Sequence, residues 1–464
     1  MYKKRDGQIG IEDFGQEAGV KLSPDNRWVK KSETIPWNEI EEKYAKLFKG
    51  KSGNVAKPLQ LALGALIIQS ERGISDEETA LQIMETPALQ YFCGLPKYEE
   101  KLPFDPSLMV HFRKRLTKEI MIEINELVID KALGKGGDTD TDNDNDNQNG
   151  GTLIVDATCA PQNIKYPQDV ELLNEAREKT EEIIDNLHEK AGGDKPRTYR
   201  EKARRDYLKT VRKRKKTKKE IRKGIGKQLG YLRRNLEHIE RYIQEGLKCD
   251  FILLETLKRL YEQQLFMHQN RVHSVPNRIV SISQPHVRPI VRGKAKAPVE
   301  FGAKLDISVA EGFTRIEHIS YEAYNEAENL QDIIERYRER EGHYPERVLA
   351  DKIYRNRDNL SFCKERGIRL SGPALGRPKK DVTRDKKQEY EDICDRVEVE
   401  RAYSLAKRKY GLGLIRTRLS ETSLSVISLA ILVMNIAKIF CADFWLALLS
   451  IFPRFVFLKW EIVQ

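Results

Sequence analysis

The charged stretch 392–407 constrains the fold more than any other part of this 464-residue chain. Its residues Arg396, Glu400, Tyr403 and Lys407 are spaced four, three and four apart, which on an α-helix places all of them on one face. A carboxylate flanked by two cations can hold a divalent metal while the cations meet phosphodiester oxygens. A solvated helix face with intrahelical ion pairs is the alternative interpretation.

Two aspartates at the ends of apolar, strand-like runs favour the metal-binding interpretation. Asp156 follows the run 153–155, and Asp351 ends a strand predicted over 347–351. A carboxylate buried at a strand end is unfavourable unless it is paired or bound to a metal. Both aspartates are therefore candidate site residues.

Residues 1–133 are predicted to form an all-α domain, because apolar residues recur at helical spacing, as in the stretch 59–67. A predicted helix over 108–116 carries Arg113, Lys114 and Arg115. Such a basic helix can enter a DNA groove, so we predict a DNA-binding domain with these three residues in contact. Many helical domains have a basic face without binding DNA, which is the alternative.

The stretch 134–151 is rich in Asp, Asn and Gly, and we predict a flexible linker there. A basic helical insertion follows over 166–272. Within it, residues 195–234 hold 19 Lys/Arg and three Asp/Glu, a local net charge of +16, while the whole chain carries +11. Apolar residues over 225–247 recur every three or four positions, which is typical of a coiled-coil-like seam.

The charge of this insertion favours binding to phosphates, although a solvated basic linker is the alternative. The residues predicted to contact nucleic acid are Arg212, Lys213, Arg214, Lys215 and Lys216. A second basic run, over 286–296, is expected to be extended and to follow a DNA backbone, with Arg292 and Lys294 in contact.

The pattern then changes to period two, which predicts paired strands over 299–310 and 313–320, turned by Glu311 and Gly312. A helix over 327–341, a strand over 347–351, a helix over 357–366, a strand over 368–371 and the Glu400 helix complete the series. Together with a first strand over 152–158, this order predicts an α/β fold, a mixed sheet flanked by helices in a domain over 152–440.

Such a sheet brings Asp156 beside Asp351, with Glu400 supplied by the helix. Three carboxylates at one point repel each other unless cations neutralise them, so we predict bound Mg²⁺ or Mn²⁺. Two such ions can activate a water or a 3′-hydroxyl and stabilise the leaving oxygen in a phosphoryl displacement. Asp156, Asp351 and Glu400 are the predicted catalytic residues and metal ligands.

The apolar run 422–437 is shorter than a bilayer span and predicts a buried helix, followed by an apolar tail over 441–464. Six cysteines without a C-x-x-C pair and a charged N-terminus predict a cytoplasmic protein, without a membrane partner. The basic balance predicts a polyanionic partner, either nucleic acid or an anionic membrane surface, and no small-molecule substrate is expected.

Several of these residues also carry a resemblance. The chain resembles bacterial insertion-sequence DDE transposases, which have an RNase H-like core and an N-terminal helical domain. Their motif Tyr-x2-Arg-x3-Glu-x6-Lys matches at Arg396, Glu400 and Lys407, with Ile393 at the Tyr position. The stretches 350–354 and 155–158 resemble the motifs around the two aspartates.

The resemblance implies metal-dependent cleavage at the ends of a mobile element and strand transfer of the 3′-OH into target DNA. Asp156, Asp351 and Glu400 would hold two ions, while Arg396, Lys407 and Tyr354 would contact DNA. It also implies double-stranded DNA as substrate, a homodimer or larger synaptic assembly, and association with the bacterial nucleoid. A non-cutting DNA-binding protein and an RNase H-like nuclease without strand transfer are the alternatives.

Overall fold

The computed structural model describes residues 2–4, 7–15, 21–46, 48, 55–135, 148–291, 299–372 and 386–451, with side chains as far as 441. It divides into two compact units, one of residues 1–160, 305–319 and 324–464, and one of residues 161–304 and 320–323. Most of the predicted linker, the predicted contacts Arg292 and Lys294, and the tail beyond Ile451 lie outside the described residues.

The N-terminal part of the first unit is helical, as predicted. Its helices are α1 (Arg27–Thr34), α2 (Trp37–Ala45), α3 (Leu59–Arg72), α4 (Asp76–Glu85), α5 (Pro87–Phe92), α6 (Leu108–Arg115) and α7 (Lys118–Leu133). Helix α3 ends where Gly73 adopts a left-handed conformation (φ 66°). Ser75, two residues after Gly73, caps the next helix: its side chain accepts a hydrogen bond from the Glu78 amide, and α4 begins at Asp76.

The described strands form one sheet of six. They are β1 (Thr152–Pro161), β2 (Arg288–Val291), β3 (Val299–Ala310), β4 (Phe313–Ser320), β5 (Arg347–Leu349) and β6 (Arg369–Leu370), in the order β2-β3-β1-β5-β6 with β4 also paired to β3. Strands β1, β5 and β6 are parallel, whereas β2 runs antiparallel to β3. The mixed α/β fold is therefore confirmed. Within the basic run predicted to be extended over 286–296, Arg288–Val291 form strand β2, which pairs with β3.

The hairpin between β3 and β4 turns at the predicted residues. Glu311 and Gly312 both have positive φ, 51° and 75°. Two left-handed residues in a row are typical of a type I′ turn, whose twist matches that of the flanking strands.

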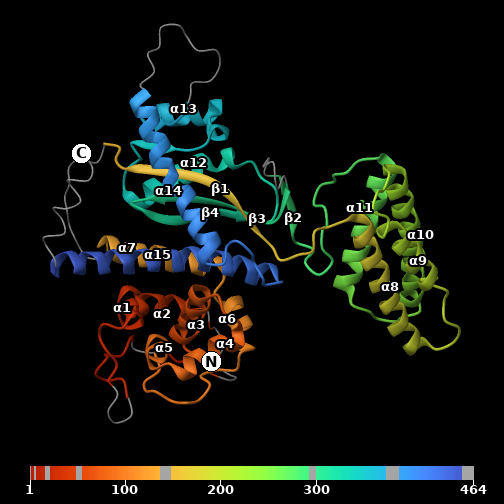
Figure 1. The fold of residues 1–464 in the computed structure, drawn as a ribbon, viewed down its shortest axis with the longest axis horizontal. Coiled ribbons are helices and arrows are strands. Elements are labelled where there is room, and N and C mark those ends of the chain that lie inside the picture. Colours follow the sequence, from red (N-terminus) through yellow and green to blue (C-terminus); the bar gives the residue numbers. More distant parts are fainter. Residues whose placement is uncertain are drawn as a thin grey trace, which may run out of the picture. The chain divides into compact units, whose positions relative to one another are not determined.

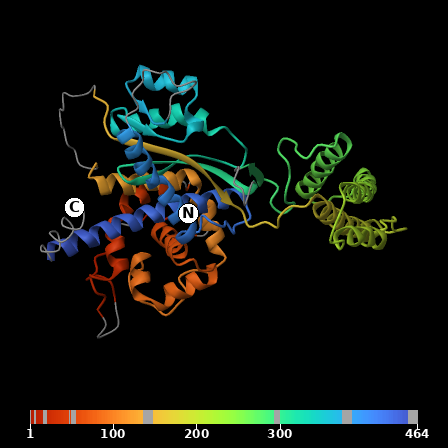
Figure 2. The same ribbon diagram turned by 45° about the horizontal axis from the view of Figure 1, so that its top comes forward.

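Helices cover both faces of the sheet (Figures 1 and 2). On one face lie α12 (Leu330–Glu341) and α13 (Arg357–Glu365), preceded by the 3₁₀ turns η1 (Glu326–Asn329) and η2 (Lys352–Tyr354) respectively. Side chains of these elements and of β1, β5 and β6 form one buried apolar cluster, which includes Leu153, Val155, Ile333, Val348 and Leu370. Burial of this cluster fixes the strand ends that carry the aspartates.

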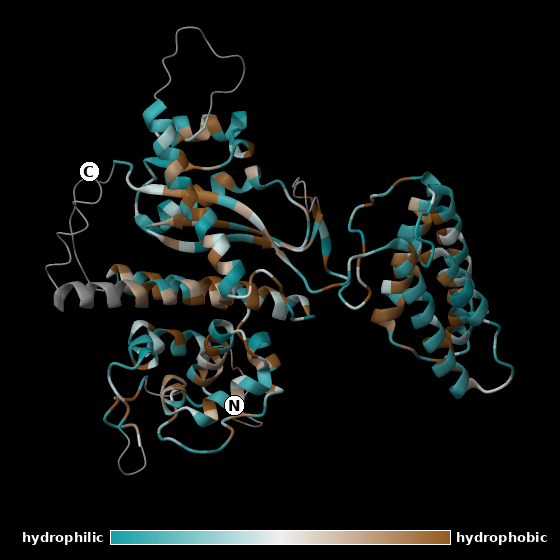
Figure 3. Cartoon of the chain, in the orientation of Figure 1, coloured by the Kyte–Doolittle hydropathy of each residue, from teal (hydrophilic) through white to brown (hydrophobic). Residues whose placement is uncertain are grey.

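The other face is closed by α7 and α15 (Ser420–Ile451) (Figures 1 and 2). Helix α15 also contacts α1, α3, α6 and α14 (Lys386–Lys409), which explains why its residues are apolar on every side (Figure 3). The segment Ser420–Cys441 is long and apolar enough to cross a membrane, but 61% of its most apolar window is buried inside the protein. The predicted buried helix is confirmed, and it continues ten residues past 441, where the separate tail was predicted to begin.

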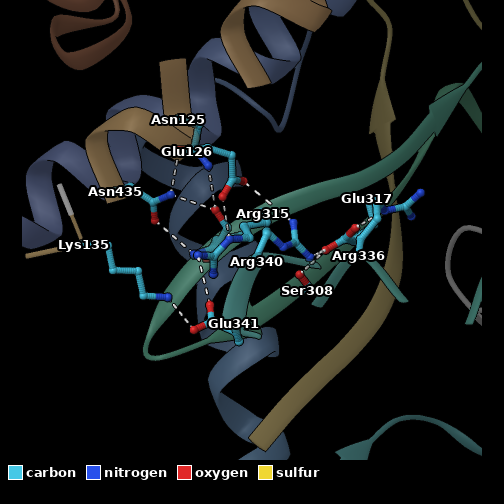
Figure 4. Close-up of polar contacts among 11 residues, drawn as sticks. Asn125, Glu126, Lys135, Ser308, Arg315, Glu317, Arg336, Arg340, Glu341 and Asn435 are labelled. Atoms are coloured by element: carbon cyan, nitrogen blue, oxygen red, sulfur yellow. Dashed lines mark hydrogen bonds and ion pairs between the residues drawn. The ribbon is translucent and has the colours of Figure 1, made fainter. Parts of the chain in front are cut away.

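A buried polar network joins the N-terminal helices to the sheet (Figure 4). Arg315 on β4 is 2% exposed and donates to Glu126 on α7 over 2.9 Å. On the same strand, Glu317 accepts hydrogen bonds from Arg336 (2.8 Å) and Arg340 (2.6 Å) of α12. The helical part and the sheet therefore share one core.

The second unit holds the predicted helical insertion, made of α8 (Asp169–Ala191), α9 (Arg200–Val211), α10 (Lys218–Gln244) and α11 (Phe251–Asn270). The predicted seam lies on α10 and packs on α8, with Leu232, Ile239 and Leu187 buried in one cluster. Residues of α11 such as Leu257 complete that cluster, so the insertion is a helix bundle rather than a two-stranded coiled coil. Its outward surfaces are mainly hydrophilic (Figure 3).

Candidate active site

The register of β1 and β5 places Asp156 and Asp351 at the same edge of the sheet. Ile154 pairs with Leu349 in parallel, and each aspartate follows its strand's member of that pair by two residues. Asp351 follows the end of β5, but Asp156 does not end its strand as predicted, because β1 continues to Pro161. Both aspartates nevertheless lie just past the last β1–β5 pair, on the side where binding sites of open α/β sheets form. The predicted proximity of these two residues therefore follows from the strand pairing.

The Asp156 side chain is half-buried, and its carboxylate accepts a hydrogen bond from the Ala157 amide at 2.8 Å. Burial raises the pKa of Asp156 above its usual value, and the negative charges of Glu326 and Asp351 act in the same direction. The Ala157 amide and the Arg396 guanidinium oppose this pKa shift without cancelling it. Asp156 thus lies within electrostatic reach of both Asp351 and Arg396.

Asp351 is exposed and caps η2, accepting from the Lys352 amide at 2.7 Å. Arg396 on α14 reaches it, with 3.7 Å between Arg396 Nη1 and Asp351 Oδ1. The other terminal nitrogen, Nη2, lies 3.5 Å from Oε1 of Glu400, one turn further along α14. The Arg396 guanidinium therefore lies between the carboxylates of Asp351 and Glu400, and its charge also lowers the pKa of Asp156.

Two sets of contacts fix α14 in this position. Asp392 accepts from Arg369 of β6 at 2.6 and 2.7 Å and from Arg347 of β5 at 3.3 Å, and these two arginines are register partners across the strands. Further along, the buried Tyr403 donates its hydroxyl proton to the main-chain carbonyl of Asp156 at 2.5 Å. The helix is thereby attached to three of the parallel strands.

Helix α14 carries two further charged residues near this site, Lys407 and Glu398. Lys407 is half-buried and lies on the helix two turns beyond Glu400. Glu398, two residues before Glu400 on the helix, pairs with Lys438 of α15 at 3.6 Å. Ile393, at the position of the motif tyrosine, is 63% exposed.

Tyr354, which the resemblance implied to contact DNA, is not at the surface. Its side chain is completely buried in the cluster between the sheet and α12, so it is not available to contact DNA in this structure. Burial raises the pKa of its hydroxyl, and the charges of Asp306, Glu326, Asp156 and Asp351 add to the effect. This hydroxyl has no hydrogen-bond partner among the described residues.

Arg113 is also placed differently from the prediction. It is 7% exposed and donates to both carboxylate oxygens of Asp76 and, at 2.8 Å, to Gln69. Its guanidinium therefore holds α3, α4 and α6 together instead of facing a DNA groove. The adjacent Lys114 and Arg115 are exposed, with Arg115 stacked 5.5 Å from the ring centroid of Phe48.

The five basic residues of the insertion that were predicted to contact nucleic acid, 212–216, lie on the loop between α9 and α10. Arg212, Lys213, Arg214 and Lys215 are exposed, and Lys216 is half-buried. Lys213 pairs with Glu220, which also forms a capping box with Thr217 at the start of α10. The loop therefore exposes several cations to solvent, and the capped start of α10 fixes its end.

No group of three or more His, Cys, Asp or Glu side chains within the described ranges is placed to hold a metal ion. The donor set at the sheet edge nevertheless suits Mg²⁺ or Mn²⁺, since carboxylate oxygens are the ligands these hard ions prefer. A cation, the Arg396 guanidinium, already lies between Asp351 and Glu400.

Sequence analysis missed a buried carboxylate beside this edge. Asp306 on β3 is fully buried and accepts from Tyr324 and Asn329, each at 2.7 Å. Its place in the alternating strand 299–310, between Leu305 and Ile307, could have drawn attention to it. It also missed Glu326, which stands in an acidic run without any distinguishing pattern.

Comparison with known proteins agrees with this arrangement. Residues 348–437 match the family described as transposase DDE domain, and residues 16–115 match the transposase domain DUF772. The uncharacterised protein ORF8 in the nfe locus of Rhizobium meliloti is 26% identical over 159 residues, 34% of this chain and 73% of that protein. No solved structure matches the chain. The first match contains Asp351, Arg396, Glu400 and Lys407, and these two segments of the chain belong to transposase domain families.

Proposed function

We propose that this transposase has an RNase H-like core that cleaves DNA at the ends of an insertion sequence and joins the 3′-OH to target DNA. The observation that carries the proposal is the meeting of Asp351, Glu400 and the Arg396 guanidinium at the strand edge that also holds Asp156. The order of the core strands, with the first in the middle and the hairpin on one side, supports the RNase H-like assignment.

In this proposal Asp156, Asp351 and Glu400 hold two Mg²⁺ or Mn²⁺ ions. When bound, the metal supplies an activated water or 3′-hydroxyl and stabilises the leaving oxygen. The chain's own contribution is to position the carboxylates, one within β1, one just after β5 and one on an anchored helix. Arg396 and Lys407, on the same face of α14, bind the phosphates on either side of the reacting bond.

The DNA is held by cations away from the reacting bond. We propose that Lys114 and Arg115 on α6, and Arg212–Lys216 on the loop between α9 and α10, contact the phosphate backbone, because these side chains are largely solvent-exposed and lie in basic stretches. Two element ends must be held together for joining, so a dimer or larger assembly in the bacterial cytoplasm, on the nucleoid, belongs to the same proposal.

The test is incubation of the purified chain with Mg²⁺ and DNA carrying the inverted repeats that flank its gene. Joined products support the proposal, cleavage without joining supports a nuclease, and binding alone supports a non-cutting DNA-binding protein. Asp351→Asn should abolish strand cleavage, while Glu398→Gln, on the opposite side of α14, should retain it. Retained cutting by Asp351→Asn would remove that residue from the site.

A further inference from the structure

The outer side of helix α11 in the insertion exposes large apolar residues. On its inner side, Leu254, Leu257 and Leu260 are buried in the bundle with α8 and α10. On the opposite side, Ile252 is 78% exposed and Phe266 is 53% exposed. Large apolar side chains exposed together on one surface are typical of a site of contact with another protein. The outer side of α11 is therefore a candidate interaction surface.

Charged residues lie between these two apolar side chains. Together they form a stripe in which residues recur every three or four positions, within about 80° of arc on a helix: Ile252, Glu255, Arg259, Glu262 and Phe266. All five are exposed. Among the described residues, Glu255, Arg259 and Glu262 form no ion pair with any other side chain. The stripe therefore offers both apolar contact and free charges of both signs to a partner.

We propose that this stripe binds the same stripe of a second copy of the chain, with the two α11 helices antiparallel. The positions of the charges define the register. Arg259 lies eight residues after the first residue of α11, Phe251, and Glu262 lies eight residues before the last, Asn270. When the helices overlap over their whole length, Arg259 of each copy therefore faces Glu262 of the other. Twofold symmetry forms this ion pair twice.

The same register brings the apolar residues of the two copies together. Phe266 of one copy faces Glu255 of the other and lies within one helical turn of that copy's Ile252. A register with Arg259 facing its own copy would instead oppose like charges and shorten the overlap. Exposed ion pairs contribute little affinity, so burial of the apolar residues supplies most of the binding, and the charges select the register.

The inference rests on the proposed function and deepens it, because it names the surface through which two copies would hold two DNA ends. A pair of single helices is smaller than a standard protein–protein interface. We therefore expect a dimer that dissociates at micromolar concentrations without DNA.

The test is sedimentation equilibrium of the full-length chain without DNA, at micromolar concentrations, where the wild type should dimerise. Arg259→Glu and Glu262→Arg should each weaken dimerisation by about tenfold or more, because each opposes like charges at both ion pairs. An equimolar mixture of these two variants should form a heterodimer about as tight as the wild-type dimer, since opposite charges then face each other again. Arg233→Glu is the matched control, at an exposed arginine of α10 that pairs with Glu237, and should dimerise as the wild type does.

Ile252→Asp and Phe266→Asp test the apolar part of the stripe. Each should also weaken dimerisation by about tenfold or more, because a carboxylate buried against apolar side chains is unfavourable. All substituted residues are exposed, so thermal unfolding of each variant should match that of the wild type at concentrations where both are monomeric.

Three results would overturn the interface: a wild type that stays monomeric throughout this concentration range, charge-reversal variants that dimerise like the wild type, or a mixture no tighter than either variant alone. Cleavage and joining of end DNA by the same preparation would then leave the proposed function in place. A dimer that responds to the substitutions as expected, in a chain that neither cuts nor joins DNA, would overturn the proposed function and keep the interface.

Discussion

The hydroxyl of Tyr403 lies 2.5 Å from the main-chain oxygen of Asp156. The helix that carries Glu400 is therefore hydrogen-bonded to Asp156, the predicted site residue on β1. Tyr403 is buried, and burial, with the charge of Asp156 next, raises the pKa of its hydroxyl well above the usual value. The hydroxyl therefore stays protonated and remains a donor at any physiological pH. The contact sets the distance between Asp156 and the helix turn that presents Glu400.

Tyr403→Phe removes this hydrogen bond without changing the shape of the ring. We expect a loss of about 1–2 kcal/mol in the free energy of unfolding, because the Asp156 carbonyl is left without its partner in a buried place. The rate of DNA cleavage should fall by more than the loss of folded protein accounts for, because the distance between Asp156 and Glu400 is no longer fixed by this hydrogen bond. Denaturant unfolding and single-turnover cleavage measure the two effects. Tyr390→Phe, at a residue 69% exposed on the same helix, should change neither.

Asp392→Asn tests the other attachment of α14. Asp392 is 7% exposed and holds Arg369 and Arg347 on adjacent strands. Its removal leaves two cations without their partner, so we expect the free energy of unfolding to fall by about 3 kcal/mol. Asp395→Asn is a milder control, because Asp395 contacts Arg347 alone among these arginines. Equal losses in the two variants would contradict the assignment.

The same residue predicts a pH dependence. Burial by itself would raise the pKa of Asp392, but the hydrogen bonds and charges of Arg369 and Arg347 outweigh it and hold the pKa below its usual value. A lowered pKa in the folded state stabilises the fold above the unfolded-state pKa of about 3.9, and this stabilisation is lost as the pH falls through the folded-state pKa. Unfolding midpoints between pH 6 and pH 3 should therefore fall more steeply for wild type than for Asp392→Asn.

The sequence predicted the parts of the fold that depend on local pattern. Alternating residues predicted the β3–β4 hairpin with its turn at Glu311 and Gly312, and the apolar run of α15 predicted a buried helix, since periodicity reports burial directly. The two aspartates were found because each follows a short apolar run, although β1 continues five residues past Asp156. Their adjacency then follows from the parallel pairing.

Long-range partners were not predictable in this way. Arg113 is one of three consecutive basic residues. It alone is buried, because it is hydrogen-bonded to Asp76, 37 positions earlier, and nothing in the basic run itself indicates this contact. Tyr354 and Glu326 likewise depend on how two 3₁₀ turns pack, which Asn359 decides through its two hydrogen bonds. Such contacts join residues far apart in the chain and leave no periodic signal.

Arg113→Ala and Lys114→Ala should separate stability from DNA binding on α6. The first leaves Asp76 without its partner and should lower the free energy of unfolding by about 3 kcal/mol. The second alters an exposed side chain and should leave stability unchanged, while weakening DNA binding and lowering its salt dependence. Thermal unfolding and fluorescence anisotropy at several salt concentrations measure the two properties. A stable Arg113→Ala chain with weakened DNA binding would restore the original prediction for Arg113.

Neutralising Arg214 and Lys215 tests the loop between α9 and α10. Each phosphate contact contributes about 0.9 to the slope of log K against log salt concentration, so the double Gln variant should lower the slope by about 2. Lys190→Gln with Lys248→Gln removes the same charge from exposed positions elsewhere in the bundle and should have less effect. Equal slopes in the two double variants would mean that net charge alone, not this loop, attracts DNA.

Arg396→Gln tests whether the guanidinium competes with metal ions. In the structure it lies 3.7 Å from Asp351 and 3.5 Å from Glu400, so ions that use both carboxylates must displace it. Without DNA, the variant should bind Mn²⁺ several-fold more tightly. The Arg396 guanidinium no longer neutralises the repulsion between the carboxylates, so a metal ion gains more by neutralising it. DNA cleavage should nevertheless fall at least tenfold, since the displaced arginine is the proposed phosphate contact.

Arg401→Gln, at an exposed cation of the same helix, is the control and should leave both properties unchanged. Weaker Mn²⁺ binding in Arg396→Gln would show that the arginine organises the carboxylates for the ions instead of competing with them.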